Sequence, residues 1–325
     1  MKVTGDLLRA HLDHTLEATH FEGLGVRYEG KVRDNYSRGN ERFIVVTDRI
    51  SAFDQVLGTI PFKGQILNLI AAYWFEKTKN IIKSHFVRVP DPNVLECIEC
   101  KPLPVEFVVR GFITGSTSTS MWTHYAAGKR SFCGHALADG LKKNQKLARP
   151  LLTPATKAAH GAHDVSASRE DILASLANDT ISADDFDAAA TMAMTLFEAG
   201  QTICAERGLI LVDTKYEFGK TASGDLVVID EIHTPDSSRF WLSGTYDERF
   251  AAGLDPEPLD KDFVRRYFTA LGYQGNGTPP PLPPEIRIGA AKRYIEAFER
   301  ITAAPFEPDT SPPLARIAKN LGLYT

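Results

Sequence analysis

The order of apolar and polar positions predicts short strands in the first third of the chain. Residues 42–47 (RFIVVT) and 105–109 (VEFVV) are runs of β-branched and aromatic residues, which favour strands. Apolar positions at helical spacing predict a helix over residues 66–78. The polar, proline-rich stretch 90–104 is typical of a connection between two parts of a chain.

Helical periodicity dominates later in the chain, after a stretch, 126–168, whose Gly, Ala, Lys and His content predicts loops. Ser182, followed three residues later by Asp185, is typical of a capped helix N-terminus, and Gly208 is typical of the end of that helix. Further helices are predicted over residues 261–271 and 284–302.

The clearest local pattern is a hairpin of two strands, 209–218 and 226–232, around a turn at 219–224. Because side chains alternate along a strand, Asp213, Lys215 and Glu217 share one face. A turn centred near Ala222 places Asp213 opposite Asp230 and Glu217 opposite Leu226, and a slip of one or two residues is compatible with the same pattern.

These elements predict an α+β fold with two lobes, since 325 residues exceed what one small core usually serves. The expected division is a strand-rich lobe over residues 1–112 and a larger mixed α/β lobe over residues 113–325, which ends in helices.

Composition adds mainly exclusions. A net charge of -4 gives no basic excess for nucleic-acid binding, so an anionic substrate must meet a local basic cluster. Residues 1–16 lack the apolar core of a signal peptide, and no apolar run approaches the ~18 residues of a membrane span, so a cytoplasmic protein is expected. Four cysteines are too few for a disulfide scaffold, and the irregular spacing of Cys97, Cys100, Cys133 and His135 favours reduced thiols over a zinc site.

The hairpin carries the first candidate chemistry. Grouped carboxylates in an apolar setting are costly unless a cation compensates, and hard oxygen ligands suit magnesium with nucleotide phosphates. A solvated face with salt bridges to Lys215 is the alternative, and the hairpin alone does not decide between them. The next turn offers Asp236, Ser237, Ser238 and Arg239, which suit the capture of phosphate or carboxylate but also an ordinary capped turn.

Three other segments carry candidate groups. The run 30–34 (GKVRD) is not a Walker loop, but it could cover phosphates, as kinase glycine-rich loops do, or be an exposed turn. Arg110, at a strand end followed by Gly115 and Ser116, suits a phosphate monoester or is simply a terminal charge. The long loop with Lys157 and Asp164 is of a functional length, without a role assigned by sequence.

At this point the chain resembles the SAICAR synthetases, in their longer, fungal-like form. The resemblance rests on segments in family order: 30–34 (GKVRD), 48–54 (DRISAFD), 103–110 (LPVEFVVR) with 114–116 (TGS), 211–219 (LVDTKYEFG) and 230–241 (DEIHTPDSSRFW). It implies a kinase-like or ATP-grasp-like nucleotide lobe over a larger α/β lobe, with ATP and Mg²⁺ in the cleft.

The resemblance also implies roles for individual residues. The ATP contacts would be Gly30, Lys31, Arg33, Glu217 and Asp230, of which Glu217 and Asp230 would hold magnesium, and adenine would meet backbone groups within 98–101. The substrate contacts would be Arg110, Ser116, Lys157, Asp164, Asp236, Ser237, Ser238 and Arg239. The catalytic groups would be Lys215, Asp213 and Arg239.

The reaction implied joins L-aspartate to the carboxylate of carboxyaminoimidazole ribonucleotide (CAIR), with ATP cleaved to ADP and phosphate, as a step of purine biosynthesis. Its partners are small molecules, with no nucleic acid or membrane, and a monomer is expected. A kinase is one alternative, although neither an HRD nor a DFG string occurs. A non-catalytic nucleotide-binding regulatory module is another, against which the complete set of candidate charges argues.

Overall fold

Two β-sheets form the framework of the computed structural model, which describes residues 3–53, 55–117, 119–156, 165–175, 181–259 and 261–323. The first sheet is antiparallel, with the spatial order β1-β2-β3-β7-β6. Its strands are β1 (Val26–Glu29), β2 (Arg33–Arg38), β3 (Glu41–Val46), β6 (Phe86–Asp91) and β7 (Val94–Ile98). A separate hairpin, β4 (Arg49–Ala52) and β5 (Gln55–Thr59), follows β3.

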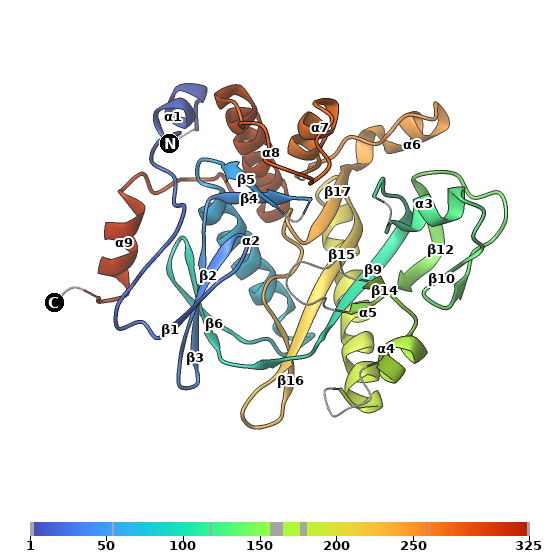
Figure 1. Cartoon of the computed structure of the whole chain (residues 1–325), viewed down its shortest axis with the longest axis horizontal. Coiled ribbons are helices and arrows are strands. Elements are labelled where there is room, and N and C mark those ends of the chain that lie inside the picture. Colours follow the sequence, from blue (N-terminus) through green and yellow to red (C-terminus); the bar gives the residue numbers. More distant parts are fainter. Residues whose placement is uncertain are drawn as a thin grey trace.

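The second sheet is larger and is built around β15 (Leu209–Lys220), which runs beside β9 (Val105–Ile113) (Figure 1). Its other strands are β8 (Lys101–Pro102), β12 (Gln145–Leu152), β13 (Ala155–Thr156), β14 (Val165–Ser166), β16 (Leu226–Ile229) and β17 (Ser238–Leu242). A small hairpin, β10 (Ser131–Phe132) and β11 (His135–Ala136), lies apart from it. The fold is therefore mixed α+β, as the sequence predicts.

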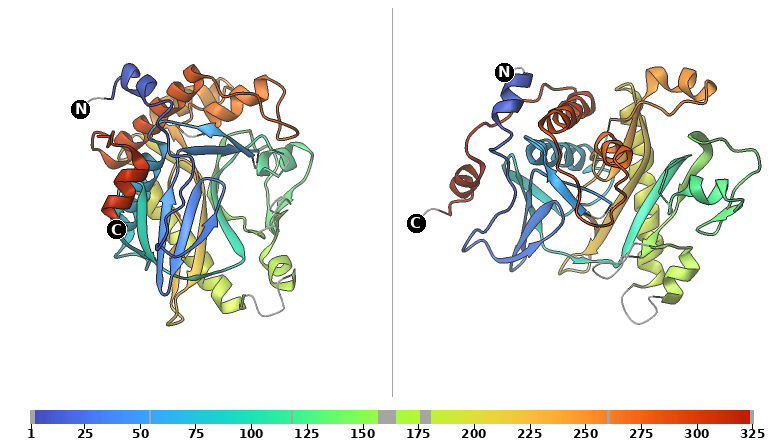
Figure 2. Two further views of the ribbon diagram at one scale, coloured as in Figure 1. Left: turned by 60° about the vertical axis from the view of Figure 1, so that its left-hand side comes forward. Right: turned by 45° about the horizontal axis from the view of Figure 1, so that its top comes forward.

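The helices cover these sheets from several sides, as the two further views make clear (Figure 2). They are α1 (Gly5–Ala10), α2 (Lys63–Thr78), α3 (Met121–Ala126), α4 (Arg169–Ser175), α5 (Ala183–Ala205), α6 (Ser243–Ala251), α7 (Asp262–Ala270), α8 (Pro284–Thr302) and α9 (Pro313–Asn320). The predicted helices at 66–78, 261–271 and 284–302 are confirmed within three residues at each end. In the described ranges, no helix combines the length and the apolarity that a bilayer span requires.

The long predicted helix is confirmed as α5, which packs against β15 and β9. The Ser182 hydroxyl caps it by accepting a hydrogen bond from the Asp185 N–H at 3.1 Å. Phe186 and Phe197 are buried in the main core, and Phe107 of β9 packs against Phe186. This leaves the opposite face of β15 free to carry polar side chains, because alternate residues of a strand point to opposite faces.

The predicted hairpin exists, but its predicted register is wrong by three residues. Glu217 pairs with Ile229 rather than Leu226, and Leu226 pairs with Lys220. The turn is centred one to two residues later than expected, because Gly224 supplies a positive φ of 87° and its N–H bonds to the Thr221 carbonyl. The second strand also ends at Ile229, three residues before the predicted end.

Two predicted loop segments contain strands. The stretch 90–104 includes β7, β8 and the end of β6, so the connection between the two sheets shortens to the residues between Ile98 and Lys101. The stretch 126–168 includes β12, which pairs with β9 across a register shift. Neither segment has a strong alternation of apolar and polar residues, which is the pattern that would have predicted its strands. In β12, about half of the residues are polar and the pairing with β9 is irregular. The division into lobes at residue 112 stays a prediction.

The C-terminal segment is attached to the first sheet by a buried ion pair. Arg316 of α9 donates to both carboxylate oxygens of Asp91, at 3.0 and 3.2 Å. The side chains are 5% and 0% exposed, so water screens this pair little. Asn320 of α9 adds a hydrogen bond to Asp91 at 2.8 Å.

Replacing Arg316 by methionine should lower the free energy of unfolding by about 3–5 kcal/mol, because Asp91 would remain buried without its cation. Urea unfolding would measure this change. The matched control is Arg300→Met in α8, whose pair with Glu296 is 41% and 45% exposed and should be worth at most about 0.5 kcal/mol. Equal effects of the two substitutions would contradict the assignment of α9 as an anchored element.

Candidate active site

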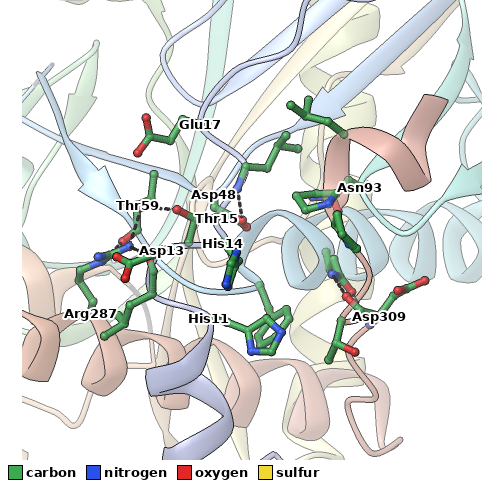
Figure 3. A pocket seen from close by; sticks show the side chains of 18 of the residues that line it. His11, Asp13, His14, Thr15, Glu17, Asp48, Thr59, Asn93, Arg287 and Asp309 are labelled. Atoms are coloured by element: carbon green, nitrogen blue, oxygen red, sulfur yellow. Dashed lines mark hydrogen bonds between the residues drawn. The ribbon is translucent and has the colours of Figure 1, made fainter.

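A cavity of about 1140 Å³ in the described part of the chain does not contain the candidate residues. It lies between the segment 10–18, the start of α8 and the segment 309–316 (Figure 3). Thr15 bonds to Thr59 within it at 2.8 Å, and Arg287 donates to the carbonyl of Thr59 at 2.7 Å.

A second cavity, of about 520 Å³, is lined by three of the five residues expected to bind ATP, namely Lys31, Glu217 and Asp230. The first sheet contributes a cross-strand row of Tyr28, Asn35 and Ile44, which the strand register aligns on one face. The second sheet contributes side chains from β9, β15 and the end of β16. The residues that line this cavity are Tyr28, Lys31, Asn35, Arg42, Ile44, His85, Cys100, Pro102, Glu106, Glu217, Ile229 and Asp230.

Arg49 fixes the backbone of the turn that contains Gly30 and Lys31. The Arg49 guanidinium donates to the Lys31 carbonyl at 3.0 Å, to the Gly30 carbonyl at 2.9 Å and to the Asp34 carboxylate at 2.9 Å. Asp34 is fully buried and also accepts a hydrogen bond from the Thr19 N–H at 2.6 Å. The backbone of the turn is therefore fixed at the edge of the cavity that Lys31 lines.

Arg33, which does not itself line this cavity, joins the two sheets through Asp230, which does. Its guanidinium lies 2.7 Å from an Asp230 oxygen and 2.8 Å from a Glu231 oxygen. Asp230 has a φ of 68°, a left-handed conformation that turns the chain away from β16. Burial disfavours the charged Arg33, but the neighbouring Asp230 and Glu231 charges outweigh burial and raise its pKa.

Lys215 is clamped between two carboxylates on the same face of the second sheet. Its ammonium lies 2.7 Å from Glu106 of β9 and 2.7 Å from Glu217 of β15. Burial opposes the charged lysine, but the two carboxylates more than offset it, so the pKa of Lys215 is raised. Burial raises the pKa of Asp230 to about 6, although Arg33 acts in the opposite direction. Cationic and anionic side chains therefore alternate in and directly beside the lining of this cavity.

A third cavity, of about 480 Å³, contains two of the residues expected to bind the substrate phosphate, Ser116 and Arg239. Gly115 has a φ of 110°, and a Cβ there would lie 2.4 Å from that of Ser120, so only glycine fits. The sequence did not single out the other basic groups of this cavity, which come from the loop before β12 and from α7. They are Lys143, Arg265 and Arg266.

Asp213 holds two arginines near this cavity. Its Oδ2 lies 3.1 Å from Arg239 and 3.6 Å from Arg110. Arg110 also donates to the Thr153 hydroxyl at 2.8 Å. The strand register explains the cluster, because Asp213 is the partner of both Arg110 in β9 and Arg239 in β17. Asp213 therefore does not lie opposite Asp230, as the predicted register had placed it.

The turn before β17 is tied to β15 by its backbone and side chains. The Ser237 carbonyl accepts a hydrogen bond from the Lys215 N–H at 3.0 Å, and the Ser238 hydroxyl lies 2.7 Å from that of Thr214. Asp236 points the other way, toward Lys63 at 2.7 Å and Tyr294 at 2.8 Å. We call residues 234–239 the substrate turn.

The structure thus brings most of the expected residues together in two neighbouring groups, linked by one face of β15. Lys157 and Asp164 lie outside the described residues. Sequence reasoning missed Glu106 and Glu231, which complete the charge pairs of Lys215 and Arg33. Glu106 was recognisable in principle, because it lies four residues before Arg110 and so shares its face of the strand.

Two buried histidines, His85 and His233, lie near these groups but take no part in the ion pairs described above. His233, 0% exposed, lies 2.5 Å from the Tyr216 hydroxyl and packs edge-on against Trp74. A Cβ on Gly200 of α5 would lie 2.4 Å from its ring, so glycine is required there. Burial lowers the pKa of His233 to about 3, and burial, aided by Arg42, lowers that of His85 to about 3. Both rings are therefore neutral at physiological pH.

A row of charged residues on β15 thus lies between two polar cavities: Glu217 lines one, and Asp213 pairs with Arg239, which lines the other, an arrangement typical of enzymes that act on anionic substrates. Comparison with known proteins agrees. The sequence profile of the SAICAR synthetase family matches residues 26–280, and the chain belongs to this family.

Individual relatives support this assignment over most of the chain. A phosphoribosylaminoimidazole-succinocarboxamide synthase of Legionella pneumophila is 47% identical over 290 residues, which cover 89% of this chain and 91% of that protein. The chloroplastic phosphoribosylaminoimidazole-succinocarboxamide synthase of Arabidopsis thaliana is 47% identical over 302 residues, which cover 92% of this chain and 72% of the length of that protein. The structure of SAICAR synthase from Saccharomyces cerevisiae with bound SAICAR aligns with a TM-score of 0.76 at 28% identity, covering 90% of this chain and 100% of that one.

The buried histidines predict how stability depends on pH. Their folded-state pKa values, about 3, lie below the ordinary ~6.5, so their contribution is present above pH ~6.5 and is lost as the pH falls toward 3. His233→Gln should reduce the slope of unfolding free energy against pH by about 1 kcal/mol per unit between pH 6 and 5. Urea unfolding at several pH values measures this slope.

The matched control is His14→Gln, which alters an exposed histidine and leaves both buried rings in place. A His233→Gln variant with the wild-type slope would show that the ring is not held neutral by burial.

Proposed function

We propose that this chain joins L-aspartate to the carboxylate of CAIR with cleavage of ATP, giving SAICAR, ADP and phosphate. Membership of the SAICAR synthetase family supports the reaction. The observation that carries the residue assignments is the single face of β15, on which Glu217 lines one polar cavity and Asp213 pairs with Arg239 of the other, with Lys215 between them. Two reactants bound at the two ends of this face would meet near Lys215.

ATP would occupy the cavity beneath the first sheet, which we propose to be a kinase-like or ATP-grasp-like nucleotide lobe. Gly30 and Lys31 lie at its edge on a turn whose backbone is braced, so Lys31 could reach phosphates there. Arg33 would add a second cation, already balanced by its two carboxylates. Cys100 and Pro102 line the same cavity, which fits an adenine near residues 98–101. A related SAICAR synthetase, 25% identical, has been solved with ADP.

Magnesium fits the carboxylates of this cavity. Glu217 and Asp230 both line it, on adjacent ends of β15 and β16. Among the residues that the structure describes, no three His, Cys, Asp or Glu side chains are grouped to bind a metal ion by themselves. Magnesium commonly uses one or two protein carboxylates and takes its remaining ligands from phosphates and water, so two carboxylates suffice. When bound, the ion would neutralise phosphate charge during phosphoryl transfer.

CAIR would bind with its phosphate in the cavity of Ser116 and Arg239, where the basic side chains outnumber the two carboxylates, Asp255 and Asp262, that pair with Lys143, Arg265 and Arg266. Arginine guanidinium groups are suited to bidentate binding of phosphate. Arg110 and Arg239, both oriented by Asp213, would face the anionic substrate, and Ser237 and Ser238 would add hydroxyl donors. Lys157 and Asp164 remain expected substrate contacts on the strength of the resemblance alone.

The chemistry requires an activated carboxylate, because a carboxylate and an amine do not condense readily in water. A CAIR carboxylate oxygen would attack the γ-phosphorus of ATP, and ADP would leave. The aspartate amine would then attack the activated carbonyl carbon, and phosphate would leave with the amine losing a proton. Lys215, held by Glu106 and Glu217, would stabilise negative charge where the two substrates meet.

The partners proposed are ATP, CAIR and L-aspartate. A monomeric state and a cytoplasmic location stay predictions, and the name of the Arabidopsis relative includes the word chloroplastic.

Replacing Glu217 by glutamine or Asp230 by asparagine should lower kcat by about 100-fold or more while the protein stays folded, because the phosphates and magnesium lose a ligand. Steady-state kinetics with a circular dichroism check would measure this. The control is Asp225→Asn in the turn of the same hairpin, where the carboxylate is 50% exposed and pairs with Lys83. Full activity of both site variants would refute the metal assignment.

Sustained release of ADP over many turnovers should require ATP, magnesium, CAIR and L-aspartate together, because the activated carboxylate formed in the first step is consumed by the aspartate amine in the second. A coupled ADP assay, omitting one component at a time or adding a chelator, measures this, and ultraviolet absorbance follows the new amide. ADP release without aspartate, with a stable phosphorylated product, would indicate a kinase instead. ATP binding without turnover under any condition would indicate a regulatory module.

A further inference from the structure

A fully buried lysine stands at the first position of α2, where nothing in the proposed reaction requires a charge. The side chain of Lys63 is 0% exposed. Burying an ammonium group is costly unless it is paired, and the positive end of the helix dipole at an N-terminus opposes a cation further. Phe62 at the N-cap makes no side-chain hydrogen bond, and the buried Asp48 carboxylate instead accepts a hydrogen bond from the N–H of Gly64 at 2.8 Å, so the ion pair of Lys63 is separate from the cap of this helix. The free-energy cost of burying this ammonium group indicates that its ion pair serves a function.

The partner of Lys63 is Asp236, whose carboxylate and carbonyl oxygens are all bound by residues from other parts of the fold. Its Oδ2 lies 2.7 Å from Lys63 Nζ, and its Oδ1 accepts a hydrogen bond from the Tyr294 hydroxyl of α8 at 2.8 Å. Its carbonyl accepts from Lys261 at 2.9 Å, and its N–H donates to the Thr234 hydroxyl at 3.2 Å. Lys63 Nζ also lies 5.5 Å from the centre of the Tyr294 ring.

Asp236 is the residue directly before the groups that face the substrate cavity. Ser237 bonds to the backbone of Lys215, and Ser238 lies 2.7 Å from Thr214. Arg239, the next residue, lines the cavity and pairs with Asp213 at 3.1 Å. A shift of Asp236 would therefore move the serines and the arginine together relative to β15.

We propose that Lys63 and Tyr294 are positioning residues, which hold the Asp236 carboxylate and thereby set the position of the substrate turn. This gives Asp236 a role behind the substrate rather than in contact with it. It also gives α8 a part in the reaction, although α8 lies beyond residues 26–280, which the family profile matches. The inference rests on the proposed function, because the turn matters through its ribonucleotide substrate.

Tyr294→Phe removes one hydroxyl and leaves the packing of the ring in place. It should raise the KM for CAIR by about threefold to tenfold, because the arginine and serines of the turn lose their alignment. The KM for ATP should stay within about twofold, because the nucleotide cavity is built from other residues. Lys63→Met should show the same selectivity with a larger effect, and Lys63→Arg should recover part of it.

A double-mutant cycle separates positioning from general stability. If Tyr294 acts through the carboxylate, Tyr294→Phe should add little to an Asp236→Asn variant, whereas independent effects would multiply. The control is Tyr273→Phe, a buried tyrosine of the same C-terminal region whose hydroxyl donates to the Gly277 carbonyl, away from the turn. It should leave the KM for CAIR unchanged.

The outcomes are distinct. An unchanged KM for CAIR in Tyr294→Phe and Lys63→Met would overturn the inference, and so would a parallel loss for all three substrates that follows a fall in Tm, since that marks a merely structural brace. Absence of SAICAR formation by the wild-type chain would instead refute the proposed function. A selective rise in the KM for CAIR with wild-type Tm, together with non-additivity in the cycle, would support the positioning role.

Discussion

The structure depends on balancing charges that are withdrawn from water along one face of β15. Asp213, Lys215 and Glu217 follow one another on this face, and each has a partner of opposite charge within 4 Å: arginines for Asp213, two glutamates for Lys215, and that lysine for Glu217. A buried charge without a partner would cost several kcal/mol, whereas a balanced row can remain in place.

The same requirement joins parts of the fold that are distant in sequence. Arg33 crosses from the first sheet to Asp230 and Glu231, so an ion-pair cluster rather than an apolar contact joins the two sheets beside the cavity of Lys31 and Glu217. At the other end of the row, Asp236 binds Lys63 of α2 and Tyr294 of α8. The surroundings of both cavities are therefore subject to the same electrostatic constraint, and the helices behind them are part of the same arrangement.

Much of the fold was predictable because it depends on neighbours along the chain. The capping pair Ser182 and Asp185 and the helical spacing of apolar residues over 284–302 are local signals, and both predictions are confirmed. The hairpin was also recognisable, but its register was not. Six turn residues allow several pairings of similar local energy. The observed register is set by Gly224 and by the pairing of β15 with β9 and β17.

The sequence by itself determined the fold class, the main helices, the shared face of Asp213, Lys215 and Glu217, and the resemblance that indicated the reaction. Only the tertiary structure decided which charges meet. Arg33 and Glu231 are 198 residues apart, and Lys63 and Asp236 are 173 residues apart. No local pattern encodes such pairs, because each is selected by the packing of whole elements and by the cost of leaving a buried charge alone.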